Sequence, residues 1–246
     1  MAIDWSFAWE CAVSTIRALP VTLLATFFPA VVGLIPGALI AAVRIRRTPV
    51  LNGLASLYNS FFRSVPLVVL LFLAYYGLPK LGNLLLAGGA RRWSPYGQDS
   101  LAVALTALTM YAAAFLSEIM RGALRSVEPR QYEAARALGM TTPQTYFRVV
   151  IPQAAVTALP NYGNFCLVLL KGTSVVFTIS VVDVMSAAKL KAEYGYRYVE
   201  AYIVAATFYI LTGLILSRLF KALERRLVQP LQPGNEQNRN NGGQGL

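Results

Sequence analysis

Five long apolar stretches dominate this chain of 246 residues. A helix of about 20 mostly apolar residues is long enough to cross the ~30 Å hydrocarbon core of a bilayer. We expect such helices at residues 20–43, 60–78, 101–120, 159–182 and 201–220. The sequence therefore predicts an all-α, polytopic membrane protein with five transmembrane helices.

Composition supports lipid as the main solvent and excludes several kinds of site. Hydrophobic residues make up 56% of the chain and charged residues 13%, against about 25% charged in a typical soluble domain. There is no histidine, so histidine-based catalysis and histidine metal sites are impossible. The two cysteines, Cys11 and Cys166, lie far apart in the sequence and are interpreted as small apolar fillers. We expect neither an enzyme nor a metal site.

The distribution of positive charge predicts how the helices are oriented, because cytoplasmic loops retain Lys and Arg. Fourteen such residues fall in three alternate segments and seven in the other three. The richer segments are 44–63, 121–148 and 218–239, and the poorer ones are 1–19, 80–92 and 189–197. This places the N-terminus outside and the C-terminus in the cytoplasm. The net charge of +11 therefore reflects loop orientation, and no nucleic-acid partner is expected.

Three parts follow from this layout. Residues 1–19 are predicted to be an N-terminal extracytoplasmic segment, and residues 20–227 a transmembrane domain. Residues 228–246 are polar and poor in apolar side chains, which is typical of a disordered tail. We expect this tail to lie in the cytoplasm.

The connection between the third and fourth spans is too patterned for a simple loop. Residues 129–138 are rich in good helix formers, and Gly139 follows as a helix stop because glycine adopts a left-handed conformation cheaply. Thr141 or Thr142 can then cap a second helix, and Gln144 lies three residues after Thr141, as in a capping box. The sequence predicts helix, tight turn and short helix on the cytoplasmic side.

This loop resembles a known motif. Glu133-Ala134-Ala135, then Gly139 after three residues, and Val149-Val150-Ile151-Pro152 after nine more are similar to the EAA loop of bacterial ATP-binding-cassette (ABC) importer permeases. That loop usually ends Ile-x-Leu-Pro, so Val149 and Ile151 are conservative departures. The resemblance assigns ATPase coupling to Glu133, Ala134, Ala135 and Gly139.

Four further segments extend the resemblance over roughly residues 15 to 227. They are similar to segments of the polar amino-acid uptake permeases, the branch with the histidine, glutamine, arginine and glutamate systems. The segments are Phe62-Arg63-Ser64-Val65-Pro66-Leu67, Tyr75-Tyr76-Gly77-Leu78-Pro79, Ser117-Glu118-Ile119-Met120-Arg121-Gly122 and Leu170-Lys171-Gly172-Thr173-Ser174. Many relatives carry Asp where this chain has Gly172.

The resemblance implies a type I ABC importer permease of the bacterial inner membrane, which forms the path for polar or charged amino acids by alternating access. Its implied partners are a second permease subunit, identical or paralogous, two ATP-binding-cassette subunits and an extracytoplasmic amino-acid-binding protein. The chain contains no GxxxxGK[ST] phosphate loop. ATP and Mg would therefore be bound by the partner ATPase, and this chain would hold no cofactor.

Three rival functions make different demands on the sequence. An ion-driven secondary amino-acid carrier would be expected to have inverted repeats and buried acidic residues in several spans, and neither stands out. A membrane-embedded enzyme would need a nucleophile or metal constellation. A structural scaffold would leave the patterned loop unexplained.

Polar residues within the fourth span are candidates for the solute path. Lys171 lies near the middle of this span, where a charge costs about 2.5–3.5 kcal/mol on insertion scales. It is a counter-charge for a substrate carboxylate, or else it pairs with Asp183, Glu118 or backbone carbonyls. The candidates are Asn161, Asn164, Lys171, Thr173 and Ser174.

Charged residues at the cytoplasmic ends of the second and third spans are gate candidates. Glu118 and Arg121 are three residues apart, so they can pair on one helix face or form a contact that breaks when the bundle opens. Arg63 has the same two interpretations. Tyr75 and Tyr76 are either an interfacial aromatic belt or a lid over the solute.

Overall fold

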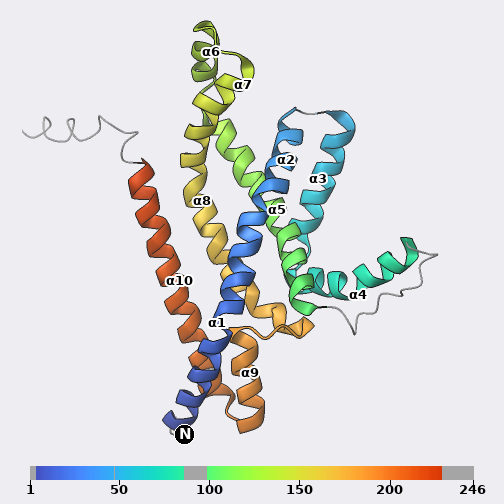
Figure 1. Ribbon diagram of the computed structural model, residues 1–246, viewed down its shortest axis with the longest axis vertical. Coiled ribbons are helices and arrows are strands. Elements are labelled where there is room, and N and C mark those ends of the chain that lie inside the picture. The colour runs from blue at the N-terminus through green and yellow to red at the C-terminus, as the bar shows by residue number, and fades with distance from the viewer. Residues whose placement is uncertain (1–3, 47, 86–98, 229–246) are drawn as a thin grey trace, which may run out of the picture.

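The protein is a bundle of helices with a projecting helical elbow at one end, as the computed structural model of residues 4–46, 48–85 and 99–228 shows (Figure 1). The α-helices are α1 (Trp5–Val32), α2 (Leu34–Arg46), α3 (Pro49–Ser64), α4 (Leu67–Leu85), α5 (Ser100–Ser126), α6 (Pro129–Ala137), α7 (Thr142–Thr145), α8 (Ile151–Gly172), α9 (Val184–Gly195) and α10 (Tyr198–Val228). A π-helix, Tyr146–Val150, joins α7 to α8, and a 3₁₀-helix, Thr173–Ile179, follows α8. The described residues contain no strand.

Five helical segments of the described chain are long and apolar enough to cross a membrane, which confirms the predicted number. They are Trp5–Arg46, Leu67–Leu84, Ser100–Ser126, Thr142–Ile179 and Tyr198–Leu227. The predicted tail 228–246 lies outside the described residues, apart from Val228 at the end of α10.

The first span begins much earlier than residue 20, where the sequence placed it. Asp4 caps α1, because its carboxylate accepts hydrogen bonds from the backbone N–H groups of Ser6 and Phe7 at 3.0 and 3.1 Å. Most of the segment predicted to precede the membrane, residues 5–19, is therefore the first part of α1. Only Gly33 separates α1 from α2, so the two helices form one rod of 42 residues.

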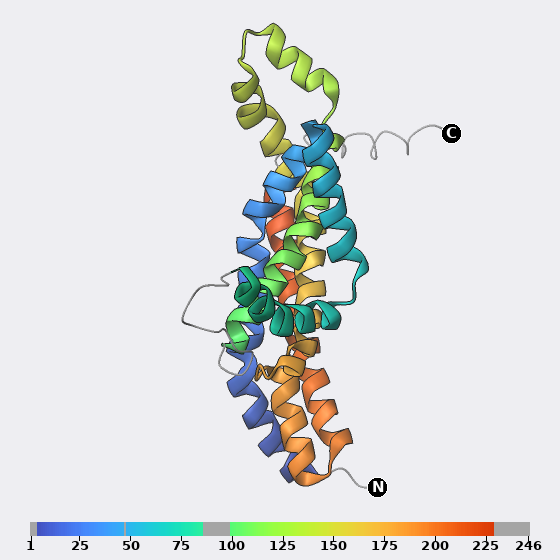
Figure 2. The ribbon, with the colours of Figure 1, turned by 90° about the vertical axis from the view of Figure 1, so that its right-hand side faces the viewer.

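The predicted second span, 60–78, is wrong in its boundaries. Val65 has extended backbone angles and Pro66 has no N–H to donate, so the helix ends at Ser64 and restarts at Leu67. The result is an additional helix, α3, packed beside α2 and α5. The span that follows, α4, turns across the bundle, as Figures 1 and 2 show.

The fourth span ends differently from its prediction of 159–182. The 3₁₀-helix stops at Ser180, whose φ of 66° is left-handed, and Asp183 then caps α9 through a 2.8 Å hydrogen bond from the Ser186 N–H. Most of the stretch 189–197, interpreted as a loop, is thus helical. Asp183 is fully buried and also accepts a 3.0 Å hydrogen bond from the Tyr209 hydroxyl, so α9 is fixed to α10.

Small residues allow the helices to approach one another closely. Three apolar clusters hold the bundle, and each contains buried alanines. The first joins α1, α4, α5 and the 3₁₀-helix, the second joins α1, α5, α8 and α10, and the third joins α1, α9 and α10. A Cβ atom added at Gly37 on α2 would lie 3.1 Å from Leu116 Cβ and 3.2 Å from the Ala113 carbonyl oxygen of α5. In lipid, such close contact replaces the hydrophobic driving force between helices.

Replacing Gly37 with Leu should therefore lower the stability of the bundle by about 1–3 kcal/mol, because the larger side chain forces α2 away from α5. Gly53→Leu is the matched control, since a Cβ atom at Gly53 meets nothing within 4 Å. Thermal unfolding of the purified protein in detergent should give a lower Tm for the first variant only. An equal Tm in both variants would contradict the close packing of α2 on α5.

Candidate functional site

The elbow, Pro129–Val150, folds as the sequence predicts. Pro129 opens α6, and Gly139 ends its turn with a φ of 82°, a conformation that costs a residue with a Cβ about 1–2 kcal/mol. The Thr141 hydroxyl accepts from the Gln144 N–H, and the Gln144 side chain accepts from the Thr141 N–H at 2.8 Å, which completes the capping box. The elbow projects beyond the ends of the spans (Figure 1).

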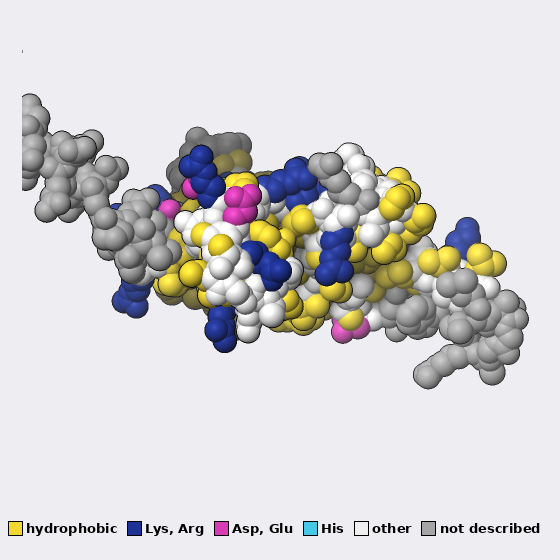
Figure 3. Space-filling view, turned by 90° about the horizontal axis from the view of Figure 1, so that it is seen from above, with side chains coloured by type: hydrophobic (Ala, Val, Ile, Leu, Met, Phe, Trp, Pro, Cys, Tyr) yellow, Lys and Arg dark blue, Asp and Glu magenta, His cyan; other side chains and the backbone are white. Residues whose placement is uncertain are grey.

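The exposed surface of the elbow combines three of the four predicted coupling residues with apolar side chains. Glu133, Ala134 and Gly139 are exposed, whereas Ala135 is buried and packs inward. Leu138 and Phe147 are 82% and 72% exposed. Sequence reasoning missed these two residues, although Leu138 lies directly before the helix stop. A view onto this end shows several separate Lys and Arg side chains on the surface and fewer Asp or Glu (Figure 3).

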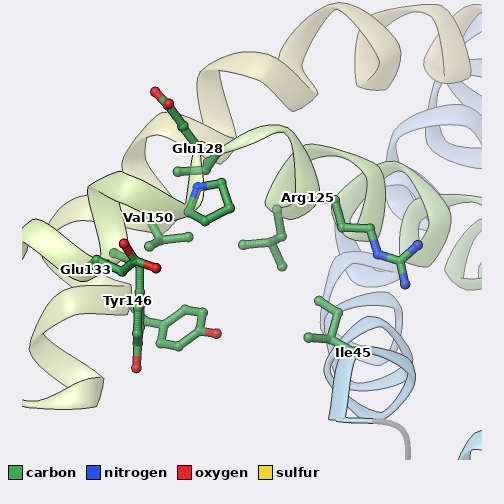
Figure 4. A pocket seen from close by; sticks show the side chains of 10 residues that line it. Ile45, Arg125, Glu128, Glu133, Tyr146 and Val150 are labelled. Carbon is green, nitrogen blue, oxygen red and sulfur yellow. The ribbon is translucent and has the colours of Figure 1, made fainter. Parts of the chain in front are cut away.

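The elbow is joined to the bundle by an unusual hinge. The π-helix Tyr146–Val150 leads from α7 into α8, and π-segments of this kind are rare and occur frequently at functional sites. A cavity of about 260 Å³ lies beneath the elbow, with Glu133 and Tyr146 on the elbow side and Ile45 on the bundle side (Figure 4). The elbow is therefore connected to α5 and α8 at its two ends, and the cavity separates part of it from the end of α2.

Three arginines converge on one carboxylate in the bundle. Arg44 on α2 forms an ion pair with Oε1 of Glu118 on α5, and Arg121 binds Oε2 through Nε at 2.9 Å and Nη2 at 2.5 Å. Arg63 on α3 comes only to within 3.7 Å of Oε1. All three predicted gate residues thus meet in one cluster. Glu118 is 17% exposed, so these contacts form in a largely dehydrated setting.

Asn59 completes this charge cluster, and sequence reasoning missed both it and Arg44. Asn59 Nδ2 donates to Ser117 Oγ at 2.8 Å and to Glu118 Oε1 at 3.1 Å. Its Oδ1 is buried and has no partner among the described residues. The sequence signal for Asn59 was its position four residues before Arg63, which places both side chains on one face of the same helix. Arg44 was counted only as a charge that stops the first span.

A polar stripe runs along one exposed face of α8. Its members are separated by four, three, four and three residues, the spacing of a seam between packed helices. They are Thr157, Asn161, Asn164, Val168 and Lys171, and every one is exposed. All of them except Val168 are polar or charged and are unfavourable against acyl chains, so this face requires water or a second polypeptide.

The stripe unites three of the five predicted path residues and excludes the other two. The Thr173 hydroxyl is buried and donates to the Leu170 carbonyl at 2.8 Å, and the Ser174 hydroxyl donates to the Lys171 carbonyl at 2.7 Å. The Lys171 side chain forms no ion pair with any carboxylate in the described part of the chain, so the predicted pairing with Asp183 or Glu118 is absent. The positive charge of Lys171 therefore has no counter-charge among the described residues.

A groove connects the stripe with the charge cluster. It has a volume of about 450 Å³ and lies between α5 and α8. Its lining residues are Glu118, Ile119, Gly122, Ala123, Ser126, Thr157 and Asn161. The groove therefore leads from Thr157 and Asn161 on α8 to Glu118, the carboxylate that holds the three arginines.

Comparison with known proteins identifies the family. The profile of a family described as "Binding-protein-dependent transport system inner membrane component" matches residues 33–229. The chain belongs to this family. It is a permease subunit of an ABC importer and an inner membrane component with several apolar helices.

Individual relatives agree with this assignment. The permease is 38% identical to the probable amino-acid permease protein YxeN of Bacillus subtilis (strain 168) over 93% of its own length and 97% of that protein. It is 36% identical to the L-cystine transport system permease protein TcyL of the same organism, covering 92% of each.

Solved structures agree as well. A crystal structure of an amino acid ABC transporter with histidines superposes with a TM-score of 0.79, 32% identity, and coverage of 92% of this chain and 100% of that chain. The MetNI methionine ABC transporter in an inward-facing conformation shares the fold, with a TM-score of 0.61 and 22% identity over 94% of this chain and 100% of that one.

Family membership settles what the permease does not do. Permeases of this kind are non-catalytic membrane components, and a separate ATPase hydrolyses ATP. They generally carry no cofactor, and they work with a partner ATPase and a binding protein. An ion-driven carrier is therefore not favoured.

Stability measurements can test the geometry of the charge cluster. Glu118→Gln should destabilise the permease by about 1–3 kcal/mol, because Arg44 and Arg121 lose charge-assisted hydrogen bonds in a largely dehydrated place. Arg121→Gln should cost less and should be non-additive with Glu118→Gln in a double-mutant cycle of unfolding free energies.

Two variants serve as controls for this cycle. Arg63→Gln should change stability by less than about 1 kcal/mol, because its ion pair is long and exposed and a cation–π contact such as that with Phe115 is worth only about 0.5–1 kcal/mol. Glu193→Gln removes the similarly exposed 3.7 Å ion pair between Glu193 and Lys189, and it should also change the free energy of unfolding only slightly. Additive effects of Glu118→Gln and Arg121→Gln would show that the two groups do not interact.

Proposed function

We propose that this permease carries a polar or charged amino acid into the cytoplasm and is driven through its elbow by a cytosolic ATPase. The main observation behind the proposal is the elbow, a compact unit that projects beyond the spans and exposes Glu133, Ala134 and Gly139. The names of the relatives, which include amino-acid and L-cystine permeases, support the class of solute.

The elbow docks into a groove of the ATPase in this proposal. Glu133 is available for a basic residue of the partner, and the exposed Leu138 and Phe147 supply apolar contact area. Ala135 instead holds α6 against the rest of the elbow. Closure of two ATPase subunits, which bind ATP and Mg, would move two elbows together. Because the elbow continues through the π-helix into α8, its motion tilts the span that carries the polar stripe.

The polar stripe of α8 lines the solute path in this proposal. A second permease subunit, identical or paralogous, encloses the path from the other side, so Asn161, Asn164 and Lys171 face water rather than lipid. Thr173 and Ser174 support this segment through their bonds to backbone carbonyls. Lys171 offers an unpaired cation to the carboxylate of an amino acid delivered by an extracytoplasmic binding protein.

The charge cluster acts as the inner gate. Glu118 ties α5 to α2 and α3 through Arg44 and Arg63, and to the next turn of its own helix through Arg121. Opening towards the cytoplasm would separate these helices at the loosest contact, which is that of Arg63. Alternating access then requires only that the elbows move and this cluster loosens.

The orientation follows from charge. The elbow end lies in the cytoplasm, and the ends of α1 and α9 near Trp5 and Tyr194 lie outside. Residues 1–19 then belong to the outer side, residues 20–227 form the permease domain, and residues 228–246 form a cytoplasmic tail.

Gly139→Val should uncouple the importer, because valine adopts the left-handed conformation at a cost of about 1–2 kcal/mol and would distort the turn of the elbow. We expect the complex to hydrolyse ATP in proteoliposomes while uptake of the amino acid is lost. Gly139→Asn is the matched control, since asparagine tolerates this conformation, and it should keep most of the uptake. Normal uptake by Gly139→Val would refute the role of the elbow.

Single cysteines can test both the path and the orientation in a variant lacking Cys11 and Cys166. Cysteines at Asn164 and Lys171 should react with a hydrophilic thiol reagent, because a water-filled path reaches them. A cysteine at Ile215, which is exposed on the apolar face of α10, should not react.

The same reagent, when it cannot cross the membrane, reports the sides. A cysteine at Leu138 should be labelled only in inside-out vesicles, and one at Tyr194, which is 86% exposed, only in right-side-out vesicles. The reversed pattern would overturn the orientation, and equal reactivity at Ile215 and Lys171 would overturn the path.

A further inference from the structure

Arg63 is the least satisfied arginine of the charge cluster. Arg121 makes two hydrogen bonds to Glu118 and Arg44 makes one, whereas Arg63 makes only a 3.7 Å ion pair and no hydrogen bond within the described chain. Its side chain is 46% exposed, against 19% for Arg44 and 24% for Arg121. A guanidinium has five N–H donors, so this one has nearly all of its donors available.

The acceptor that Arg63 approaches is already in use. Oε1 of Glu118 accepts from Arg44 and from Asn59, and Oε2 accepts twice from Arg121. Three cations therefore share one anion, and the cluster has an excess of positive charge. Such an excess attracts a further oxyanion, which a guanidinium binds best in a bidentate manner.

Aromatic packing holds this guanidinium in place although its ion pair is weak. The Arg63 guanidinium carbon lies 5.5 Å from the ring centroid of Phe115 on α5. Phe115 stacks on Phe165 of α8 with centroids 5.4 Å apart and planes 17° apart. Arg63 is thus held by a cation–π contact with α5, on a ring that itself packs against the helix carrying the polar stripe.

The position of the cluster indicates where the oxyanion comes from. Glu118 lies two turns inside the end of α5, about 12 Å along the helix from Ser126. At that depth an exposed guanidinium needs water or an anion, because acyl chains offer it nothing. Glu118 also lines the groove between α5 and α8 into which the stripe leads. An anion that follows the stripe therefore arrives beside the cluster.

We propose that Arg63 binds the α-carboxylate of the transported amino acid on its way to the cytoplasm, in exchange for its loose contact with Glu118. This inference rests on the proposed function, since it requires that an amino acid uses the path. Glu118 presents the same chemical group as the solute and keeps Arg63 in position between transport events. Lys171 in the last turn of α8 and Arg63 nearer the elbow then form two successive carboxylate sites.

Binding to the purified complex of permease and ATPase tests the proposal. The complex is placed in nanodiscs without nucleotide or binding protein, and the probes are the standard amino acid that the wild-type importer takes up fastest and its α-amide. The wild type should prefer the acid over the amide by roughly 10-fold to 100-fold, the value of a charge-assisted contact. In a Lys171→Gln background, which removes the other proposed carboxylate site, Arg63→Gln should reduce this preference to below about threefold and leave the Kd of the amide unchanged. Arg63→Lys keeps the charge without the fork, and its preference should lie between the two.

Controls distinguish the alternatives. Arg225→Gln removes an exposed arginine of α10 outside the cluster and should keep the wild-type preference. An unchanged preference on adding Arg63→Gln to the Lys171→Gln background, in a complex that still binds its ATPase, would overturn the proposal. If the preference instead depends on phosphatidylglycerol in the nanodisc and not on Arg63, the guanidinium serves a lipid phosphate and the proposal is wrong. If the wild-type importer takes up no amino acid with ATP, the proposed function itself fails, and this inference fails with it.

Discussion

Every polar group at membrane depth must find a partner or water, and this requirement organises the permease. Backbone groups satisfy it by helix formation, so the described spans are helical. Polar side chains fall into two groups, one with partners and one without partners among the described residues. Glu118 gathers three arginines and an asparagine from α2, α3 and α5, whereas Asn161, Asn164 and Lys171 on the stripe of α8 have no side-chain partner among the described residues. The first arrangement ties helices together, and the second requires a path or a second subunit.

The elbow is joined to the bundle at both of its ends, through Val127 and Glu128 to α5 and through the π-helix to α8, and a cavity lies beneath it. The segment Thr142–Ile179 runs from α7 through the π-helix and α8 to the 3₁₀-helix, so displacement of the elbow is transmitted directly into the span with the polar stripe. The cavity beneath the elbow leaves space between Tyr146 and Ile45 for that displacement. Buried Asp183, bound to Tyr209 and followed by the Val184 N–H that donates to Thr22, anchors the chain just beyond the far end of the segment.

Local signals in the sequence predicted the elbow because its structure is determined locally. Gly139, Thr141 and Gln144 each act within a few residues, and their conformations are as expected. Apolar length likewise gave the number of spans. The break at Pro66 and the early start of α1 were missed because hydropathy does not register a missing N–H or a capping carboxylate at Asp4. Arg44 and Asn59 could not be assigned to Glu118, since their contacts join residues 74 and 59 positions apart.

The strength of each cation's contacts matters more for transport than the number of cations. A site that binds a solute tightly retains it, so successive sites must each be satisfied incompletely. Lys171 has no ion pair among the described residues, and Arg63 has one long contact to an oxygen that other donors already occupy. Arg44 and Arg121, which are bound closely to Glu118, keep the helices together instead. The same carboxylate therefore serves structure through its short contacts, and through its long contact with Arg63 it leaves one cation free to exchange partners.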